Sequence, residues 1–317
     1  MLNQLFGIPL RLNLTLSLSE KNMGKNIAIV TCSELPELFG GEKLLVPALQ
    51  QMQLEPTITI WDDPQVQWSQ FDLILIRCTW DYHEKLEAFK NWLDFLATLD
   101  VMVVNDVGTM RWNLNKSYLF ELQSNACPVI PSIKLVPEDR RSLSSLIELM
   151  QIDEVVVKPT QSAGAWRTLR VNRANAAAHE NEFNHWRQEQ AFLLQAFMPE
   201  IVSQGEWSLI FFEGRYSHSL LKRAKEGDFR VQSDHGGTVL AQEATLEMQT
   251  QAQAILLSLE EMPLYARVDG VMRGGQFMLM ELELIEPELF LDVDPAAATR
   301  FATAIHTRLV QEKSPLA

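Results

Sequence analysis

The sequence lacks the features that mark several protein classes. Only three of its 317 residues are cysteines (Cys32, Cys78 and Cys127), and they lie far apart without CxxC or Cys/His spacing. We therefore expect reduced thiols. We expect neither a disulfide framework nor a zinc site. No apolar run approaches the roughly 20 residues that a membrane span requires. None of the six histidines stands in a motif with a serine or cysteine, which argues against a hydrolase with a nucleophile–histidine pair.

Basic residues are outnumbered as well. The 27 Lys and Arg against 41 Asp and Glu give a net charge of −14. The phosphate backbone of nucleic acids and the surface of anionic membranes both need a basic footprint, so we expect neither as a partner. A local basic pocket for nucleotide phosphates stays compatible with this composition.

The first part of the chain predicts an α/β unit. Residues 1–22 are Leu-rich but lack a basic region and a cleavage site, so we expect a poorly ordered N-terminal extension and no signal peptide. Beyond them, short apolar runs alternate with helical patterns; the runs are Lys25–Cys32, Thr57–Trp61, Phe71–Arg77 and Val101–Val104. This order predicts a parallel α/β domain over residues 23–110. Ligands bind beyond the carboxyl ends of such strands, so Cys78–Tyr82 either faces a substrate or simply covers the sheet.

A small-residue loop follows in the middle of the chain. Arg111–Gln123 has the spacing of one helix, and Glu154–Val157 reads as a strand that leads into Lys158. The loop Thr160–Ala165 comes next, before a strand over Trp166–Val171. Backbone N–H groups of such a loop, with a lysine beside it, suit phosphate oxygens. With Gly164 as its one glycine, this loop is a weak motif by itself.

A cluster of basic residues follows the hairpin predicted at 206–221. Four of them fall within nine positions: Lys222, Arg223, Lys225 and Arg230. Arg230 alternates with Phe229 and Val231, which favours a strand that points Arg230 into a site. A solvated basic loop is the alternative.

A carboxylate-rich hairpin is predicted near the C-terminus. Residues 266–272 and 277–285 are apolar runs joined by a Gly-Gly turn. Glu281 and Glu283 share one face of the second strand, and Asp269 can come up beside them across the hairpin. Three such carboxylates predict a magnesium site. A solvated acidic face is the alternative.

Together these motifs resemble the ATP-grasp superfamily, in the branch of glutathione synthetase and ribosomal-protein glutamate ligase. The matching stretches are NKSYL, VVVKPTQSAGA, LLQAFMPEI with GEWSL, KRAKEGDFRVQSDHGG, and YARVDG with MELELIEP. The strings WDY, RWNLNK (as RWNxxK) and ELELIEP (as an ELEIxEP-like string) are also similar to ligases of the cycloserine-forming cyclo-ligase type. Two departures stand out: the loop after Lys158 is poor in glycine, and Glu283 takes a position where asparagine is frequent. The resemblance implies an α/β (α+β) chain in which the N-terminal parallel domain precedes a two-subdomain ATP-grasp fold, with boundaries at 111–195 and 196–317.

The resemblance also implies roles for single residues. Those that would hold ATP are Lys116, Lys158, Gln195, Phe197, Met198 and Glu206. Those that would surround the transferring phosphoryl group are Lys222, Arg223 and Arg230. The magnesium ligands would be Asp269, Glu281 and Glu283, for two ions, with manganese as a substitute.

The function implied is that of an ATP-dependent ligase that forms a C–N bond. It would activate a small-molecule carboxylate as an acylphosphate, with magnesium, for attack by an amine. Phosphoryl transfer depends on positioning and positive charge, which agrees with a chain that has cations and carboxylates but no nucleophile–histidine pair. A ligase that adds amino acids to a peptide or protein, and a non-catalytic nucleotide-binding protein, are the alternatives. The expected location is the cytoplasm, and a homo-oligomer is left open.

Overall fold

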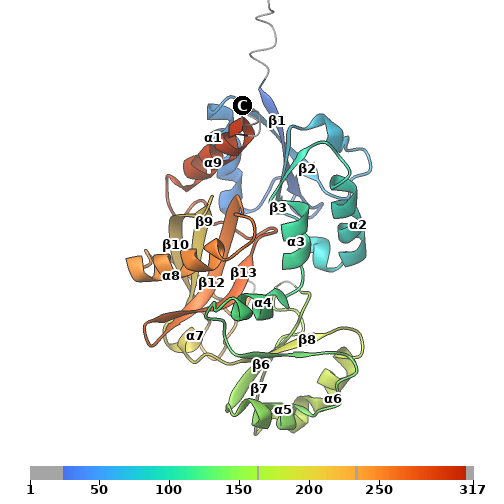
Figure 1. Cartoon of the computed structure of the whole chain (residues 1–317), viewed down its shortest axis with the longest axis vertical. Helices are drawn as coiled ribbons and strands as arrows, with labels where there is room; N and C mark the ends of the chain where they lie inside the picture. Colours follow the sequence, from blue (N-terminus) through green and yellow to red (C-terminus); the bar gives the residue numbers. More distant parts are fainter. Residues whose placement is uncertain (1–23, 163, 233–234, 312–317) are drawn as a thin grey trace, which may run out of the picture.

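Three β-sheets, each covered by helices, form the framework of the chain (Figure 1). A computed structural model describes residues 24–162, 164–232 and 235–311. The expected N-terminal extension, residues 1–22, lies outside the described residues.

The first sheet is parallel, in the strand order β2-β1-β3-β4. Its strands are β1 (Lys25–Thr31), β2 (Leu54–Ile60), β3 (Leu73–Cys78) and β4 (Met102–Val104). One face packs on α1 (Leu45–Gln51) and α9 (Ala297–Gln311), and the other on α2 (Leu86–Leu96) and α3 (Val107–Asn113). The short 3₁₀ helices are η1 (Gly40–Leu44), η2 (Trp68–Gln70) and η3 (Trp80–His83). Coverage on both faces explains why the central strands are continuous apolar runs, and the parallel α/β prediction is confirmed.

The second sheet is antiparallel and forms the lower lobe in Figure 1, in the order β5-β8-β6-β7. Its strands are β5 (Ser132–Leu135), β6 (Glu154–Pro159), β7 (Leu169–Asn172) and β8 (Phe192–Ala196). It packs on α5 (Leu143–Met150) and α6 (Ala176–Trp186). Ser142 begins α5 by accepting a hydrogen bond from the Ser145 amide, the usual way to satisfy a free N–H at a helix start.

The third sheet lies between the other two, in the order β11-β10-β9-β12-β13. Its strands are β9 (Glu206–Phe212), β10 (Arg215–Arg223), β11 (Thr238–Ala241), β12 (Tyr265–Arg273) and β13 (Gln276–Glu283). The helices α4 (Tyr118–Ser124) and α8 (Leu246–Leu257) share a core with it, and α7 (Glu200–Ser203) precedes β9. The predicted carboxylate hairpin is β12–β13, and its two turn glycines have φ of 58° and 83°, as the tight hairpin turn requires.

The C-terminal helix α9 joins the first and third sheets. Phe301 on this helix stacks on Phe212 of β9, with ring centroids 4.6 Å apart, and meets Tyr265 of β12 edge-on. The same core includes Ile27 and Ile29 of β1. The first and third units are therefore held together by a shared core. No helix in the described ranges is both long and apolar enough to cross a membrane.

The single helix predicted over 111–123 is wrong. The structure has α3 up to Asn113 and α4 from Tyr118, with Lys116 in the connection. The Lys116 amide donates to the Thr160 carbonyl at 2.7 Å, outside any helix pattern. The break brings Lys116 to the end of β6, next to the small-residue loop.

Two predicted strands also differ from the structure. The strand over 166–171 begins only at Leu169. The stretch Phe229–Val231 is a loop, because the Asp228 carboxylate accepts hydrogen bonds from the amides of Phe229 and Arg230 and so replaces a strand partner. Three alternating residues were too short a pattern to specify a strand.

Candidate active site

A cavity of about 460 Å³ is lined by residues from all three sheet units. The β12–β13 hairpin forms part of its lining with Arg267, Asp269, Glu281 and Glu283. The second unit adds Lys158 of β6 and Gln195 of β8. The first unit adds an aromatic wall that consists of Phe39, Trp80 and Tyr82. A volume of this size suits a nucleotide or a small substrate.

Strand register brings four charged side chains of the hairpin together. Asp269 lies opposite Glu281, and Arg267 lies opposite Glu283. Arg267 donates to Asp269 at 2.9 and 3.0 Å and also pairs with Glu283. The sequence interpretation missed Arg267. Its signal was present, because a residue two positions before Asp269 on a strand points to the same side.

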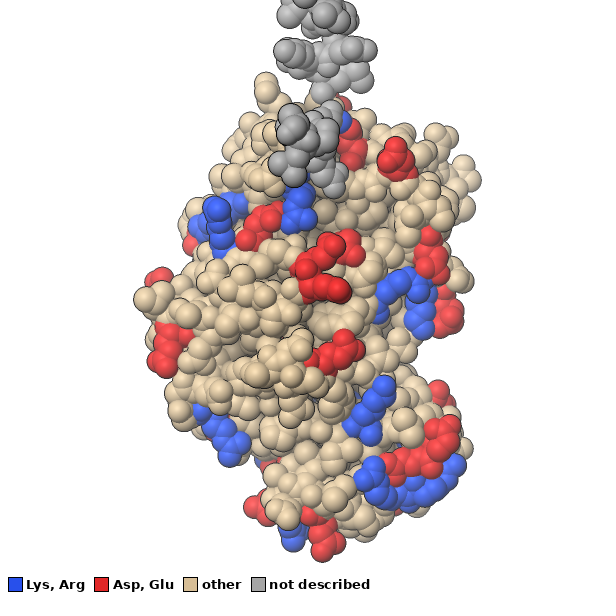
Figure 2. Space-filling view, in the orientation of Figure 1, with Lys and Arg blue, Asp and Glu red and all other residues tan. Residues whose placement is uncertain are grey.

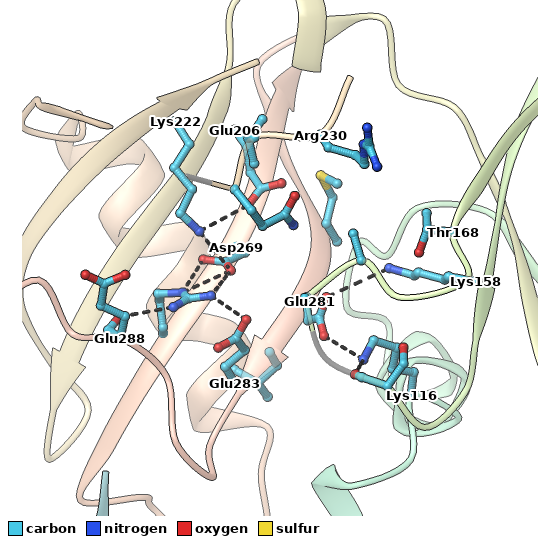
Figure 3. A pocket seen from close by; sticks show the side chains of 18 of the residues that line it. Lys116, Lys158, Thr168, Glu206, Lys222, Arg230, Asp269, Glu281, Glu283 and Glu288 are labelled. Atoms are coloured by element: carbon cyan, nitrogen blue, oxygen red, sulfur yellow. Dashed lines mark hydrogen bonds and ion pairs between the residues drawn. The ribbon is translucent and has the colours of Figure 1, made fainter. Parts of the chain in front are cut away.

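Asp269 is the central carboxylate of the left half of Figure 3. It is 3% exposed and accepts from Ser208 at 2.6 Å and from Lys222 at 3.5 Å. Burial alone would raise the pKa of Asp269, but the charges of Arg267 and Lys222 hold it below its ordinary value. Lys222 also donates to Glu206 at 3.4 Å. The pKa of Glu206 is raised because burial outweighs the attraction of Lys222.

Glu281 is held from the other side by two lysines of different elements (Figure 3). The Lys116 ammonium lies 2.9 Å from its carboxylate and that of Lys158 lies 4.0 Å away. Burial would raise the pKa of Glu281, but these lysines lower it. Burial also lowers the pKa of Lys158, against the attraction of Glu281. Lys116 further donates to the Ser162 carbonyl at 2.8 Å, which ties it to the small-residue loop.

Positive charge is thus concentrated inside an acidic chain. The cavity cations that pair with buried or half-buried carboxylates are Lys116, Lys158, Lys222 and Arg267. Outside the grey atoms, the face in Figure 2 shows acidic and basic side chains interspersed. A polyphosphate that enters the cavity can take over the cations by forming charge-assisted hydrogen bonds of the same kind.

Within the described ranges, no three His, Cys, Asp or Glu side chains are gathered closely enough to hold a metal ion. The three predicted ligands are each paired with Lys or Arg instead. Their chemistry still fits magnesium, which prefers oxygen donors and commonly uses one or two carboxylates together with nucleotide phosphates and water. Asp269 and Glu281, which face each other, are the carboxylates that would hold it. Burial raises the pKa of Glu283 to about 7, despite Arg267, so this side chain is a poorer ligand.

Most other predicted site residues line the cavity, and two do not. Gln195, Met198, Glu206, Lys222 and Arg230 are among the lining residues. Phe197 instead packs under the Arg170 guanidinium, 3.8 Å from its ring centroid, and against Phe229. Arg223 is exposed, because it follows the inward Lys222 on β10 and so points to the opposite face.

Arg230 lines the cavity but stands apart from the buried ion pairs (Figure 3). Its guanidinium forms a two-armed pair with Asp228, with contacts of 2.8 and 3.2 Å. The hydrogen bonds from Arg230 hold the pKa of Asp228 far below its ordinary value. The pair therefore stays charged. Arg230 places its positive charge at the cavity but does not pair with a carboxylate of the hairpin.

The aromatic wall is tied to the segment that follows β13. Phe39 and Trp80 pack with ring centroids 5.0 Å apart, and the Trp80 indole donates to the Glu286 carbonyl at 2.9 Å. Burial, with Glu283 nearby, raises the pKa of Glu286 to about 8. The stretch Cys78–Tyr82, for which the sequence left two roles open, thus contributes Trp80 and Tyr82 to the cavity.

Comparison with known families defines the class. The model of the prokaryotic glutathione synthetase ATP-grasp domain matches residues 122–286, which is more than half of the chain. The model of the N-terminal domain of D-cycloserine synthetase DcsG matches residues 27–105. The chain therefore belongs to the ATP-grasp family and is an ATP-dependent ligase that forms a C–N bond. The resemblance stated from the sequence is confirmed.

Individual relatives are similar to this chain over most of its length. The chain is 28% identical over 282 residues to the cycloserine biosynthesis protein DcsG of Streptomyces lavendulae, covering 84% of this chain and 92% of that protein. The crystal structure of D-cycloserine synthetase DcsG matches with a TM-score of 0.81 at 26% identity, over 90% of this chain and 99% of that one. A D-alanine–D-alanine ligase from Bacillus anthracis matches with a TM-score of 0.65 at 14% identity, over 91% and 98% of the two chains, which shows a common fold.

Proposed function

We propose that the protein uses ATP to activate the carboxylate of a small molecule as an acylphosphate, which an amine then opens. The observation that carries this proposal is the set of four paired cations around one cavity, Lys116, Lys158, Lys222 and Arg267. Phosphoryl transfer requires this kind of site, because its catalysis is positioning plus stabilisation of charge on the phosphate oxygens.

In the first step a carboxylate oxygen of the substrate attacks the γ-phosphorus, and the bond from that phosphorus to the ADP oxygen breaks. In the second step the amine nitrogen attacks the acyl carbon, the C–O bond to phosphate breaks, and inorganic phosphate leaves. The amine loses one proton as the amide forms. Lys116 and Lys158 bind the ATP phosphates, and Lys222 and Arg267 bind the transferring group. Arg230 leaves Asp228 to bind the same group or the substrate carboxylate.

The remaining cavity residues complete the nucleotide site. Gln195 and Met198 contact adenine, and Glu206 lies beside the ribose. Asp269 and Glu281 would hold magnesium, which would neutralise phosphate charge. We expect two ions, which manganese can replace. Phe197 and Arg223 lie outside the cavity and have no direct part in this assignment.

The substrate class follows from the size of the cavity and from the relatives. A volume of about 460 Å³ suits a small molecule better than a folded protein terminus. The name of one relative, D-cycloserine synthetase, gives a small amino-acid derivative as its product. We therefore propose an amino acid or its derivative as the acid, with the amine in the same or in a second molecule. Because ATP is consumed, we place the reaction in the cytoplasm.

The test is a screen for substrate-dependent ADP release. The full chain with Mg-ATP is offered L- and D-amino acids, singly and in pairs, and then short peptides. Release of ADP with small acids, together with its loss in an Asp269→Asn variant, is the expected result. Release with peptides alone would favour the peptide ligase over the small-molecule ligase.

A further inference from the structure

The segment Leu284–Leu289, which follows β13, is held in an unusual way. It forms no strand or helix, yet each of its six successive backbone carbonyl groups accepts a hydrogen bond from a side chain. The donors, in order from Leu284 to Leu289, are Asn105, Tyr265, Trp80, Arg77, Arg267 and His218. An irregular segment ordinarily leaves such carbonyls to water, so this one is fixed by the surrounding side chains.

Three of the six donors, Asn105, Trp80 and Arg77, belong to the N-terminal unit built on the first sheet, although the segment itself continues the third sheet. Arg77 at the end of β3 donates to the Pro287 carbonyl, and Trp80 donates to that of Glu286. Glu42 accepts from the Leu289 amide at 2.8 Å. The first unit therefore determines the position of a segment from the third.

Arg77 and Glu42 also form an ion pair of 2.9 Å with exposed side-chain fractions of 0% and 1%. A buried ion pair is costly to desolvate and is weak evidence for stability, so a contribution to stability is not a sufficient explanation for this pair. Here each partner also contacts the same short segment, since Arg77 donates to the Pro287 carbonyl and Glu42 accepts from the Leu289 amide. Another N–H group of Arg77 donates to the Ile76 carbonyl. The pair fixes the position of Leu284–Leu289 relative to β3.

Three residues of the segment line the cavity, namely Ile285, Glu286 and Glu288, and the last two are the acidic ones. They share the cavity with the aromatic wall of Phe39, Trp80 and Tyr82. This wall comes from the N-terminal unit, outside the matched ATP-grasp domain at 122–286. Of the two nucleotide lysines, Lys158 lies inside this matched range and Lys116 lies shortly before it. In Figure 3, Glu288 lies on the side of the cavity away from Lys116 and Lys158, which is the side that these lysines leave for a substrate other than ATP.

We propose that Arg77, Glu42 and Trp80 are positioning residues for the non-nucleotide substrate, acting through the backbone of Leu284–Leu289. They hold Glu286 and Glu288 at the substrate end of the cavity, so the N-terminal unit controls substrate binding without reaching the transferring phosphate. This inference rests on the proposed ligase function at the same site.

Three variants test the inference. Trp80→Phe keeps the aromatic wall but removes the donor to Glu286. Arg77→Lys keeps the charge beside Glu42 but lacks the second arm that reaches Pro287. The matched control is Trp112→Phe, which removes an indole donor of the same kind, to Glu121 at 2.7 Å, outside the segment.

Hydrogen exchange gives the first readout and needs no substrate. We expect backbone amides of 284–291 to exchange about tenfold faster in Trp80→Phe and Arg77→Lys than in wild type, with amides of β6 unchanged. The second readout is ADP release with D-alanine as the first probe, or with the acid that is most active in the screen. There KM for the acid should rise about fivefold, while kcat and KM for ATP stay within twofold.

Unchanged exchange in the segment would overturn the inference, as would a rise of KM for ATP equal to that for the acid. An equal effect in Trp112→Phe would reduce the role to general stability. If wild type releases no ADP with any acid, the proposed function fails. Faster exchange without a selective rise in KM would instead refute only the positioning role.

Discussion

The β12–β13 hairpin and the loop at residues 224–232 both supply charge to one cavity, but they hold it differently. On the hairpin, Asp269 is 3% exposed and contacts Arg267, Lys222 and Ser208. In the loop, Arg230 pairs with Asp228, which is two residues away and has a side chain 21% exposed. The hairpin charges are fixed by neighbouring strands of one sheet that are far apart in the sequence. The loop charges are fixed by a local turn.

This difference suggests a division of labour. Charges that are preorganised before the ligand arrives stabilise the developing charge without further reorganisation, and the hairpin has this property. The Arg230–Asp228 pair is a half-exposed surface pair and is worth little, so it can be exchanged for a phosphate or carboxylate at small cost. We therefore expect hairpin variants to alter stability and turnover together, and loop variants to alter turnover alone.

The largest effect is expected for Asp269→Asn. Turnover should fall at least about a hundredfold, because the site loses a carboxylate for magnesium and the partner of two cations. The free energy of unfolding should fall by about 2 kcal/mol, since hydrogen bonds from Arg267 and Lys222 to a charged group are lost. ADP release and chemical denaturation measure the two. The control is Glu213→Gln, which breaks a half-exposed pair with Arg308 of 2.7 Å, and a loss of stability as large in this control would remove the contrast between buried and exposed pairs.

Arg230→Ala isolates the loop. Turnover should fall about a hundredfold, because one donor to the transferring group is lost, while the Kd of ATP and the melting temperature stay near wild type. Arg223→Ala is the matched control, as an exposed arginine of the same basic cluster that points away from the cavity. Calorimetry and ADP release are the measurements. Parallel losses of ATP affinity and turnover would instead assign Arg230 to the nucleotide site.

Lys158→Ala tests the proposed nucleotide site, in which Lys158 of β6 faces Glu281 of the hairpin. The Kd of ATP should rise about tenfold through the loss of one phosphate contact, with little change in the melting temperature of the ligand-free protein. Lys134→Ala, an exposed lysine of the same sheet, should leave the Kd unchanged. Titration calorimetry decides, and equal ATP affinity in Lys158→Ala and wild type would exclude this lysine from the site.

The smallest effect concerns pH and Glu286. Burial, with Glu283 nearby, raises the pKa of Glu286 in the folded chain to about 8, against 4.5 for an ordinary glutamate. The folded state therefore holds this proton longer than the unfolded state, so stability should decline as pH rises between these values. Replacement by Gln should flatten this decline of the melting temperature with pH, by roughly 2–4 °C for each kcal/mol of pH-dependent stability that is removed. Glu260→Gln, on the exposed surface, should keep the wild-type slope, and an unchanged slope in Glu286→Gln would contradict the raised pKa.

Much of the hairpin could be predicted because its signals are local. The Gly-Gly turn and the alternation around Glu281 specify both the register and the shared face. The same alternation marks Arg267, which the sequence interpretation missed. By contrast, Phe229–Val231 has only three alternating residues, and the Asp228 side chain satisfies the amides of Phe229 and Arg230 locally.

The position of the segment Leu284–Leu289 could not be predicted from the sequence. Its acceptors are backbone carbonyls, which every residue has and which carry no side-chain signal. Its donors are spread from Arg77 to Arg267, and only the packing of the first sheet against the third brings them together. Local patterns thus predict faces and turns, whereas contacts between units depend on how those units dock.

The most direct test of the account is the fate of oxygen in the substrate carboxylate. The acid that supports ADP release is prepared with ¹⁸O at both carboxylate oxygens, and the phosphate released after turnover with an amine is analysed by mass spectrometry. Attack of the carboxylate on ATP predicts one ¹⁸O atom in each phosphate. Phosphate without ¹⁸O, with all of the label kept in the product or the acid, would contradict acylphosphate formation and with it the proposed function.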